Sequence, residues 1–259
     1  MYEHAADAEP ARLDDSILGP VAAAEEPAPA RAPASALFEV ILCSGYPTQL
    51  VLVVILTSLG MSIRTPSGGL DPAFVFVLSL LDAVFLVSLI VYLIRARGER
   101  VRDVLLGHRP VLREALLGVT LVPIVFVAAV LLLGLLLTLA PGLHNVPRNP
   151  LEAMVQTPRD AIIFSVVVML SGGLREEVQR GFIVHRFDQH LGGATVGVAA
   201  YSVAFGLGHV EQGWDAALAT GLLGAIWGFI YLLRRSIVAP VVSHAGFNIL
   251  QLIKFLSLR

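Results

Sequence analysis

Residues 116–139 read LLGVTLVPIVFVAAVLLLGLLLTL and contain no charged residue. At about 1.5 Å per residue, a helix of this length exceeds the roughly 30 Å hydrocarbon core of a bilayer. The pair Pro141-Gly142 follows closely, and such a pair is typical of a helix end. The segment therefore predicts a transmembrane helix, because an isolated segment in lipid can satisfy its backbone N–H and C=O groups only within itself.

Six further apolar stretches flank this segment. They cover about 36–61, 73–94, 161–187, 195–210, 216–233 and 237–256. The first is interrupted by Glu39 and by SGYPTQ at 44–49, which indicates either a kinked span or an interfacial helix followed by a short span. Hydrophobic residues form 56% of the 259 positions and charged residues only 15%. We therefore expect an all-α, polytopic membrane helix bundle with about seven transmembrane helices.

The N-terminal residues differ from the rest of the chain. Residues 1–36 are rich in Ala, Pro, Asp and Glu, as in EEPAPARAPA at 25–34, and show no apolar periodicity. They also lack the basic region and early apolar core of a signal peptide. We expect 1–36 to be a disordered arm and 37–259 to be the transmembrane helical domain.

The distribution of arginine predicts an orientation. The connection 95–113 carries six arginines, which marks it as cytoplasmic. The alternation of spans then places the turn 185–193 and the pair Arg234-Arg235 on the same side, and 141–157 on the other. We expect a multi-pass protein of the bacterial inner or plasma membrane, in contact with the lipid bilayer and without a nucleic-acid partner.

Ionisable residues inside the expected spans form three clusters. The clusters are REEVQRGF at 175–182, FGLGH at 205–209 and HAGFN at 244–248. Because such residues are costly in hydrocarbon, they usually indicate function. Asp82 lies in the second span without an obvious partner, and a hydrogen bond to another helix is its expected role. His185 and His190 are expected at the membrane interface.

Helix geometry limits what the first and third clusters can do. Arg180 follows Glu176 by four residues and Glu177 by three, so it can reach either carboxylate and leave the other available as a base. His244 and Asn248 are four residues apart and share one helix face. Two histidines, an amide and a carboxylate that converge in a bundle would suit the activation of a water molecule.

His209 completes this expected site. Gly206 and Gly208 precede it and permit close contact with a neighbouring helix. His209 and His244, with one carboxylate, are candidate ligands for Zn²⁺, although a site without metal fits the same residues.

The ordered set Glu-Glu near Arg, Phe-x-x-x-His and His-x-x-x-Asn resembles the CPBP family (CAAX protease and bacteriocin-processing, or Abi) of intramembrane proteases. The resemblance covers about 160–255, and the second and third motifs match at Phe205 and His209 and at His244 and Asn248. It implies that a glutamate of the first motif activates water with help from the two histidines and the asparagine.

The first motif departs from the family pattern, which has three residues between Glu-Glu and Arg where this chain has two. Alignment on Arg180 places Arg175 at the first glutamate of the pattern and Glu176 at the second. The catalytic glutamate is then Glu176, or Glu177 if the helix is locally shifted. A loss of activity in this branch is the third possibility.

We therefore expect an intramembrane endopeptidase, glutamate-dependent or metal-dependent, with its site in the C-terminal half. Its substrate would be a peptide or protein, membrane-anchored ones included. The expected site residues are Glu176, Glu177, Arg180, His209, His244 and Asn248. The main alternative is a non-catalytic membrane partner, such as an immunity or scaffold protein on the same fold. A transporter fits less well because the chain shows no internal repeat.

Overall fold

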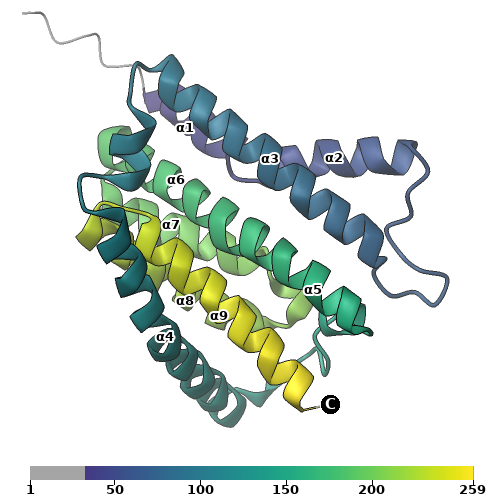
Figure 1. Ribbon diagram of the computed structural model, residues 1–259. Helices are drawn as coiled ribbons and strands as arrows, with labels where there is room; N and C mark the ends of the chain where they lie inside the picture. The colour runs from purple at the N-terminus through teal and green to yellow at the C-terminus, as the bar shows by residue number, and fades with distance from the viewer. Residues whose placement is uncertain (1–32, 259) are drawn as a thin grey trace, which may run out of the picture. The chain divides into compact units, whose positions relative to one another are not determined.

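The computed structural model describes residues 33–258, and this part of the chain is almost entirely helical (Figure 1). Within it, the only β-pairing is an isolated bridge between Arg64 and Leu70. The expected arm 1–36 lies outside the described residues except for 33–36, which begin the first helix. The all-α prediction is confirmed.

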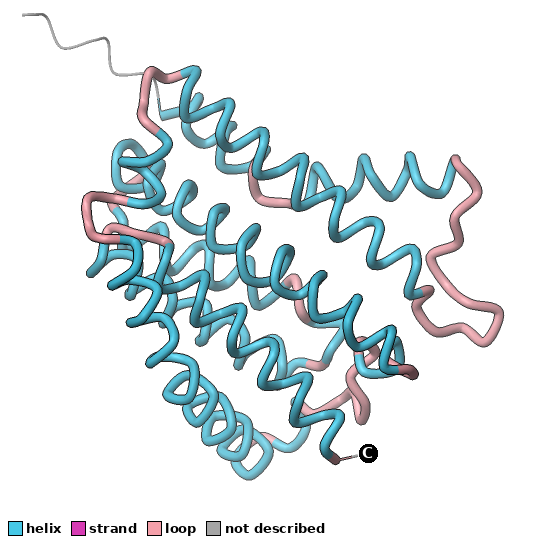
Figure 2. The backbone as a smooth tube through the Cα atoms, viewed as in Figure 1, coloured by secondary structure: helices cyan, strands magenta, loops and turns pink. Residues whose placement is uncertain are grey.

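Loops and single helical turns join the helices, and a long loop connects α2 to α3 (Figure 2). In chain order the elements are α1 (Pro33–Leu42), α2 (Tyr46–Ser58), α3 (Pro72–Ala96), η2 (Arg102–Leu106), α4 (Val111–Leu139), η3 (Pro141–Leu143), η4 (Glu152–Met154), α5 (Pro158–Val167), η5 (Val168–Arg175), α6 (Glu176–His190), α7 (Ala194–Leu207), η6 (Val210–Gln212), α8 (Trp214–Arg234) and α9 (Val238–Ser257). The elements η2 and η5 are π-helices, and η3, η4 and η6 are single 3₁₀ turns. All seven expected apolar segments are helical over most of their length.

Three of the described helices are long and apolar enough to cross a membrane. They are α3, α8, and α4 taken together with η2; the bent pair α1 and α2 makes a fourth if it is counted as one span. The prediction of about seven spans is thus supported for these helices. For α5 to α6, α7 and α9 it stays a prediction.

The first apolar segment is bent. Helices α1 and α2 meet at an angle of 40°, and Gly45 at the junction has a φ of 90°, which an L side chain rarely adopts. The bend fits both a kinked span and an interfacial helix followed by a short span, and these two interpretations both stay predictions.

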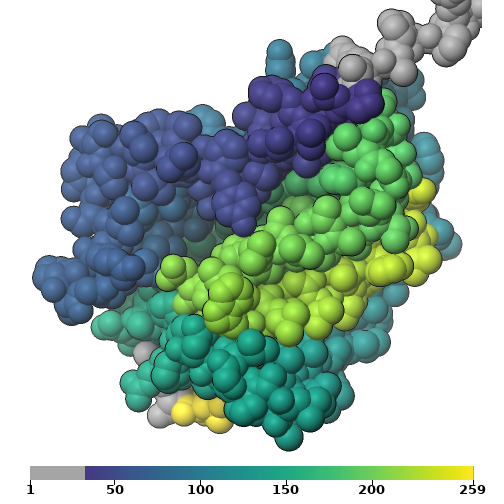
Figure 3. All heavy atoms as spheres, turned by 180° about the vertical axis from the view of Figure 1, so that it is seen from behind, coloured from purple at the N-terminus to yellow at the C-terminus, as the bar shows by residue number. Residues whose placement is uncertain are grey.

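Packing of the C-terminal helices forms the framework of the bundle. Helix α9 lies along α4 and η5, and α7 lies between α6 and α8. Helix α1 packs on α6, and a hydrogen bond from Tyr46 to the carbonyl of Ala204 joins α2 to α7. Figure 3 shows the purple and blue α1 and α2 beside the green α6 and α7.

The contact between α7 and α8 depends on Gly206. A Cβ atom at this position would lie 2.7 Å from the carbonyl oxygen of Ala217 and 3.2 Å from the Cα of Gly221. Both are backbone atoms and cannot move aside independently of their helix. The expected close approach at Gly206 is therefore confirmed, whereas the atoms nearest to a Cβ at Gly208 are two carbonyl oxygens of α7 and the hydroxyl of Tyr46.

Gly206→Ala should lower the free energy of unfolding by about 1–3 kcal/mol, because the new methyl group forces α7 and α8 apart. Gly134→Ala in α4 is the matched control, since a Cβ there meets nothing within 4 Å. The control should gain up to about 1 kcal/mol from improved helix propensity. Thermal unfolding in detergent measures both, and equal melting temperatures for the two variants would contradict the packing argument.

Ion pairs join α1 to the ends of α3 and α6. Glu39 accepts from Arg97 Nε and from Arg186 Nε, each at 2.8 Å. Glu39 is only 6% exposed and Arg186 is fully buried. Glu39 thus interrupts the apolar pattern of the first segment because it is needed as a buried partner for two arginines.

Glu99 extends this ion network beyond the end of α3. Its carboxylate accepts from Arg186 Nη1 at 2.6 Å, from His185 Nε2 at 2.7 Å and from Gln189 Nε2 at 2.8 Å. The partly buried His185 is thus a network member, and His190 lies 3.2 Å from an Arg97 nitrogen.

Burial alone would raise the pKa of Glu99, but hydrogen bonds from His185, Gln189 and Arg186 outweigh it and lower the pKa from 4.5 to about 2. Folding therefore favours the ionised form. The stabilisation is complete above pH 4.5 and is lost as the pH falls from there towards 2.

Glu99→Gln should accordingly lose stability near neutral pH and should show a weaker fall in melting temperature than the wild type as the pH drops below about 4.5. Thermal unfolding across this range checks the prediction. If the melting temperatures of the two proteins fall in parallel with pH, folding does not stabilise the ionised form of Glu99.

Candidate active site

A buried ion pair lies at the centre of the site. The Glu177 carboxylate contacts the guanidinium of Arg180 one turn later in α6, and it accepts a hydrogen bond of 2.8 Å from Nδ1 of His244 in α9. Glu177 and Arg180 are each 1% exposed and His244 is 5% exposed. Helical spacing places both Glu176 and Glu177 within reach of Arg180, and Glu177 is the one that pairs with it.

Aromatic rings surround the Arg180 guanidinium. Its central carbon lies 5.0 Å from the ring centre of Tyr201, 5.2 Å from that of Phe205 and 5.7 Å from that of Trp227. The negative faces of aromatic rings attract a cation at such distances. These contacts join α6 to α7 and α8 around one buried charge.

His244 is held on three sides. Its ring stacks on Trp227 with centroids 3.8 Å apart, and it meets Phe205 edge-on at 6.1 Å. Because an ionised carboxylate can only accept a hydrogen bond, Nδ1 of His244 is the donor to Glu177. Nε2 is then directed towards Glu176, whose Oε2 lies 3.7 Å away.

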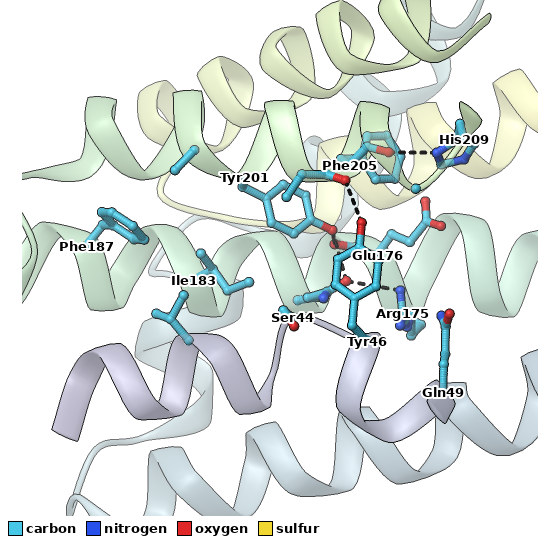
Figure 4. A pocket seen from close by; sticks show the side chains of 16 residues that line it. Ser44, Tyr46, Gln49, Arg175, Glu176, Ile183, Phe187, Tyr201, Phe205 and His209 are labelled. Atoms are coloured by element: carbon cyan, nitrogen blue, oxygen red, sulfur yellow. Dashed lines mark hydrogen bonds between the residues drawn. The ribbon is translucent and has the colours of Figure 1, made fainter. Parts of the chain in front are cut away.

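Glu176 and His209 line the same cavity, which has a volume of about 230 Å³ (Figure 4). Its walls come from the α1–α2 junction, the start of α2, the end of η5, α6, α7 and the residues just after α7. The Glu176 side chain is 16% exposed, so its carboxylate has access to this space while that of Glu177 does not. Glu176 is therefore the carboxylate available to a bound molecule.

His209 follows the C-terminal end of α7, where the chain leaves the helix at Gly208. Its Nδ1 lies 2.8 Å from the carbonyl oxygen of Phe205, which can only accept, so Nδ1 is the donor. Nε2 of His209 is left for another partner. The ring also meets Phe205 edge-on at 4.8 Å, so Phe205 contacts both histidines.

Asn248 lies one helical turn after His244, as expected, but it does not line the cavity. Its amide donates to the carbonyl oxygen of Val168 in η5 at 3.4 Å. A Cβ at Gly172 would lie 2.6 Å from the same amide nitrogen, so glycine there allows α9 to approach η5.

Arg175 and Asp82 form a second buried ion pair, with Nη2 and Oδ2 2.5 Å apart. The Arg175 Nη1 also donates to Gln179 Oε1 at 3.0 Å. Asp82 therefore has the polar partner on another helix that was expected. No pattern in the sequence indicated that this partner would be Arg175.

The structure thus brings together most of the expected residues. Glu176, Glu177, Arg180 and His244 are in direct contact or within 3.7 Å of a neighbour in the set, and His209 joins them across the cavity. Trp227 was missed in the sequence, because an aromatic residue in an apolar helix resembles any other core residue.

The zinc prediction concerns His209, His244 and one carboxylate. Among residues 33–258, no group of three or more His, Cys, Asp or Glu side chains is placed to hold a metal ion. Nδ1 of His209 is engaged with a carbonyl and Nδ1 of His244 with Glu177, while Phe205 contacts both rings. These contacts leave Nε2 of each ring for another partner, and a zinc ion held by both histidines stays a prediction.

Comparison with known proteins supports the assignment suggested by the motifs. Residues 158–250 match the family described as type II CAAX prenyl endopeptidase Rce1-like. This segment contains all six expected site residues. No curated protein and no solved structure matches the chain.

Glu177→Gln should destabilise the protein by about 3–5 kcal/mol, because it leaves the buried Arg180 cation without its anionic partner. Glu176→Gln should cost much less, since Glu176 has only the 3.7 Å contact with His244 and is partly exposed. Urea or thermal unfolding in detergent compares the two. Equal losses would show that the two carboxylates carry similar structural roles.

Proposed function

Because residues 158–250 belong to the Rce1-like CAAX protease family, we propose that this chain is an intramembrane endopeptidase in which Glu176 activates the hydrolytic water. The choice of Glu176 as the general base rests on one observation. Glu176 reaches the cavity that His209 also lines, whereas Glu177 is sealed between Arg180 and His244. A general base must lie within reach of the proton that it removes.

In the proposed reaction, a water molecule lies between the Glu176 carboxylate and Nε2 of His209. Glu176 takes a proton from the water as its oxygen attacks the carbonyl carbon of the scissile peptide. The resulting tetrahedral oxyanion accepts a hydrogen bond from Nε2 of His244, which requires that this ring carry a proton on both nitrogens, since Nδ1 already donates to Glu177. Glu176 then passes its proton to the amide nitrogen, the C–N bond breaks, and a carboxylate and an amine leave.

Glu177, Arg180 and Asn248 have supporting roles in this proposal. Glu177 orients His244 through Nδ1, and Arg180 holds Glu177 in place. Asn248 would be a second donor to the oxyanion, which requires its amide to turn from the long 3.4 Å bond to Val168. Each added donor of this kind contributes a few kcal/mol to lowering the barrier.

The substrate that we propose is a peptide or protein, with membrane-anchored substrates included. The family description names CAAX prenyl endopeptidases, and three of the described helices are long and apolar enough to cross a bilayer. We further propose about seven spans in a bacterial inner or plasma membrane, with the arginine-rich connection 95–113 in the cytoplasm.

Zinc remains a separate proposal. The described histidines do not gather around one point with a carboxylate, so no step above uses a metal. Elemental analysis of the purified protein addresses zinc directly: about one equivalent per chain, lost in His209→Ala and His244→Ala, would support it.

A non-catalytic membrane partner on the same fold is the second candidate. The observation that favours it is Arg175 at the position of the first glutamate of the family pattern. Such a protein would need the buried ion pairs but not a cavity-facing carboxylate.

Wild-type protein in detergent should cleave members of a quenched peptide library. Glu176→Gln should lower kcat by about 10²–10⁴-fold while the helical content is unchanged, because only the proton acceptor is removed. Glu211→Gln, an exposed carboxylate outside the cavity, is the matched control and should retain activity.

Full activity in Glu176→Gln would exclude Glu176 as the base. Loss of activity in Glu177→Gln without loss of stability would instead transfer the role to Glu177. Cleavage by the wild type would exclude the non-catalytic candidate.

A further inference from the structure

Arg175 replaces a glutamate of the family pattern with the opposite charge, and the fold provides this cation with a dedicated partner. Asp82, in the middle of α3, pairs with it at 2.5 Å, and their side chains are only 2% and 8% exposed. A buried cation without an anion would cost several kcal/mol, so the charge reversal at 175 depends on Asp82.

The pair is the centre of a polar chain that crosses the cavity walls. Asp82 accepts from Thr48 Oγ1 at 2.7 Å and from Gln49 Nε2 at 3.2 Å, both in α2. On the other side Arg175 donates to Gln179 in α6. These polar contacts fix the positions of α2, α3, η5 and α6 relative to one another.

Gln179 continues the chain to the remaining walls. Its amide nitrogen donates to the carbonyl of Cys43 at 2.7 Å, and its Oε1 accepts from Tyr201 in α7 at 3.0 Å. Gln49, Arg175, Gln179 and Tyr201 all line the cavity. The polar surface that a substrate meets beside Glu176 is therefore held in place by these hydrogen bonds and the Asp82–Arg175 ion pair.

Gly45 makes the arrangement possible. A Cβ at this position would collide with the Arg175 guanidinium, so the break between α1 and α2 provides the space for the larger, positively charged side chain. The backbone at Gly45, the anionic partner Asp82 and the arginine at position 175 therefore fit one another.

We propose that Asp82 and Arg175 are a positioning pair that sets the spacing of the cavity walls, and that position 175 and position 82 can be changed only together. The proposal rests on the proposed function, since the wall they hold is that of the substrate cavity. Neither residue takes part in the chemistry. Disturbing the pair should therefore raise KM, while loss of the base Glu176 lowers kcat.

Three variants test the pair. Arg175→Glu restores the Glu of the family pattern but opposes two buried carboxylates, and it should raise KM by about tenfold or more and lower the melting temperature. The reversed pair, Arg175→Glu with Asp82→Arg, should return KM to within about threefold of the wild type. The neutral pair, Arg175→Gln with Asp82→Asn, leaves no unpaired charge and should fold, with KM raised and kcat within about threefold.

Arg235→Glu is the matched control. It reverses the charge in the exposed pair with Asp188, whose side chains are 62% and 38% exposed, and it should leave KM and melting temperature unchanged. A wild-type KM in the neutral pair would overturn the proposal. So would a reversed pair that recovers neither stability nor KM relative to Arg175→Glu.

A second readout does not depend on catalysis. Ala204→Cys places a thiol on the α7 wall of the cavity, in a background where the buried Cys43 is replaced by Ala. Its labelling rate with a methanethiosulfonate reagent should change by about threefold or more in the neutral pair and return in the reversed pair. If the wild type cleaves no peptide, the proposed function fails, but the labelling rate still tests the role of the Asp82–Arg175 pair. A labelling rate that is unchanged in the neutral pair would overturn the proposed positioning role.

Discussion

The buried contact of Glu177 with Arg180 and His244 is the interaction on which the site depends. Removing two charges from water is costly, and the cost is offset only if each finds a well-placed partner. Arg180 meets this condition with one carboxylate and three aromatic rings from α7 and α8. Helices α6, α7, α8 and α9 are therefore fixed around one charge, and the carboxylate of Glu176 faces the cavity.

The π-helix η5 determines which carboxylate faces which way. It ends at Arg175, directly before Glu176, and π-helical turns often occur at functional sites because they rotate the residues that follow. In this chain they direct Glu177 towards α9 and Glu176 towards the cavity.

Ion pairs of buried carboxylates also join the helices at the end of the bundle that holds the connection 95–113. Glu39 and Arg186 form a network between α1 and α6, where burial of the charges holds the helices together. At the start of α4, Glu114 receives two hydrogen bonds from Arg234 at the end of α8. These pairs explain carboxylates that would otherwise conflict with their apolar helices.

Much of the fold could be read from the sequence, because hydrophobic segments of about twenty residues have few alternatives to a helix. Part of the site could be predicted in the same way, since Arg180 lies within reach of both Glu176 and Glu177 by helical spacing alone. The sequence could not choose between them, because that choice depends on where His244 arrives from a helix 67 residues later.

The sequence by itself therefore determined the helical class, the candidate residues and their order along the chain. The tertiary structure decided which of these residues meet. It paired Asp82 with Arg175, buried Glu177 between Arg180 and His244, and left Glu176 beside the cavity. The physical reason is that periodicity specifies contacts within a helix, whereas ion pairs between helices depend on packing that no single segment encodes.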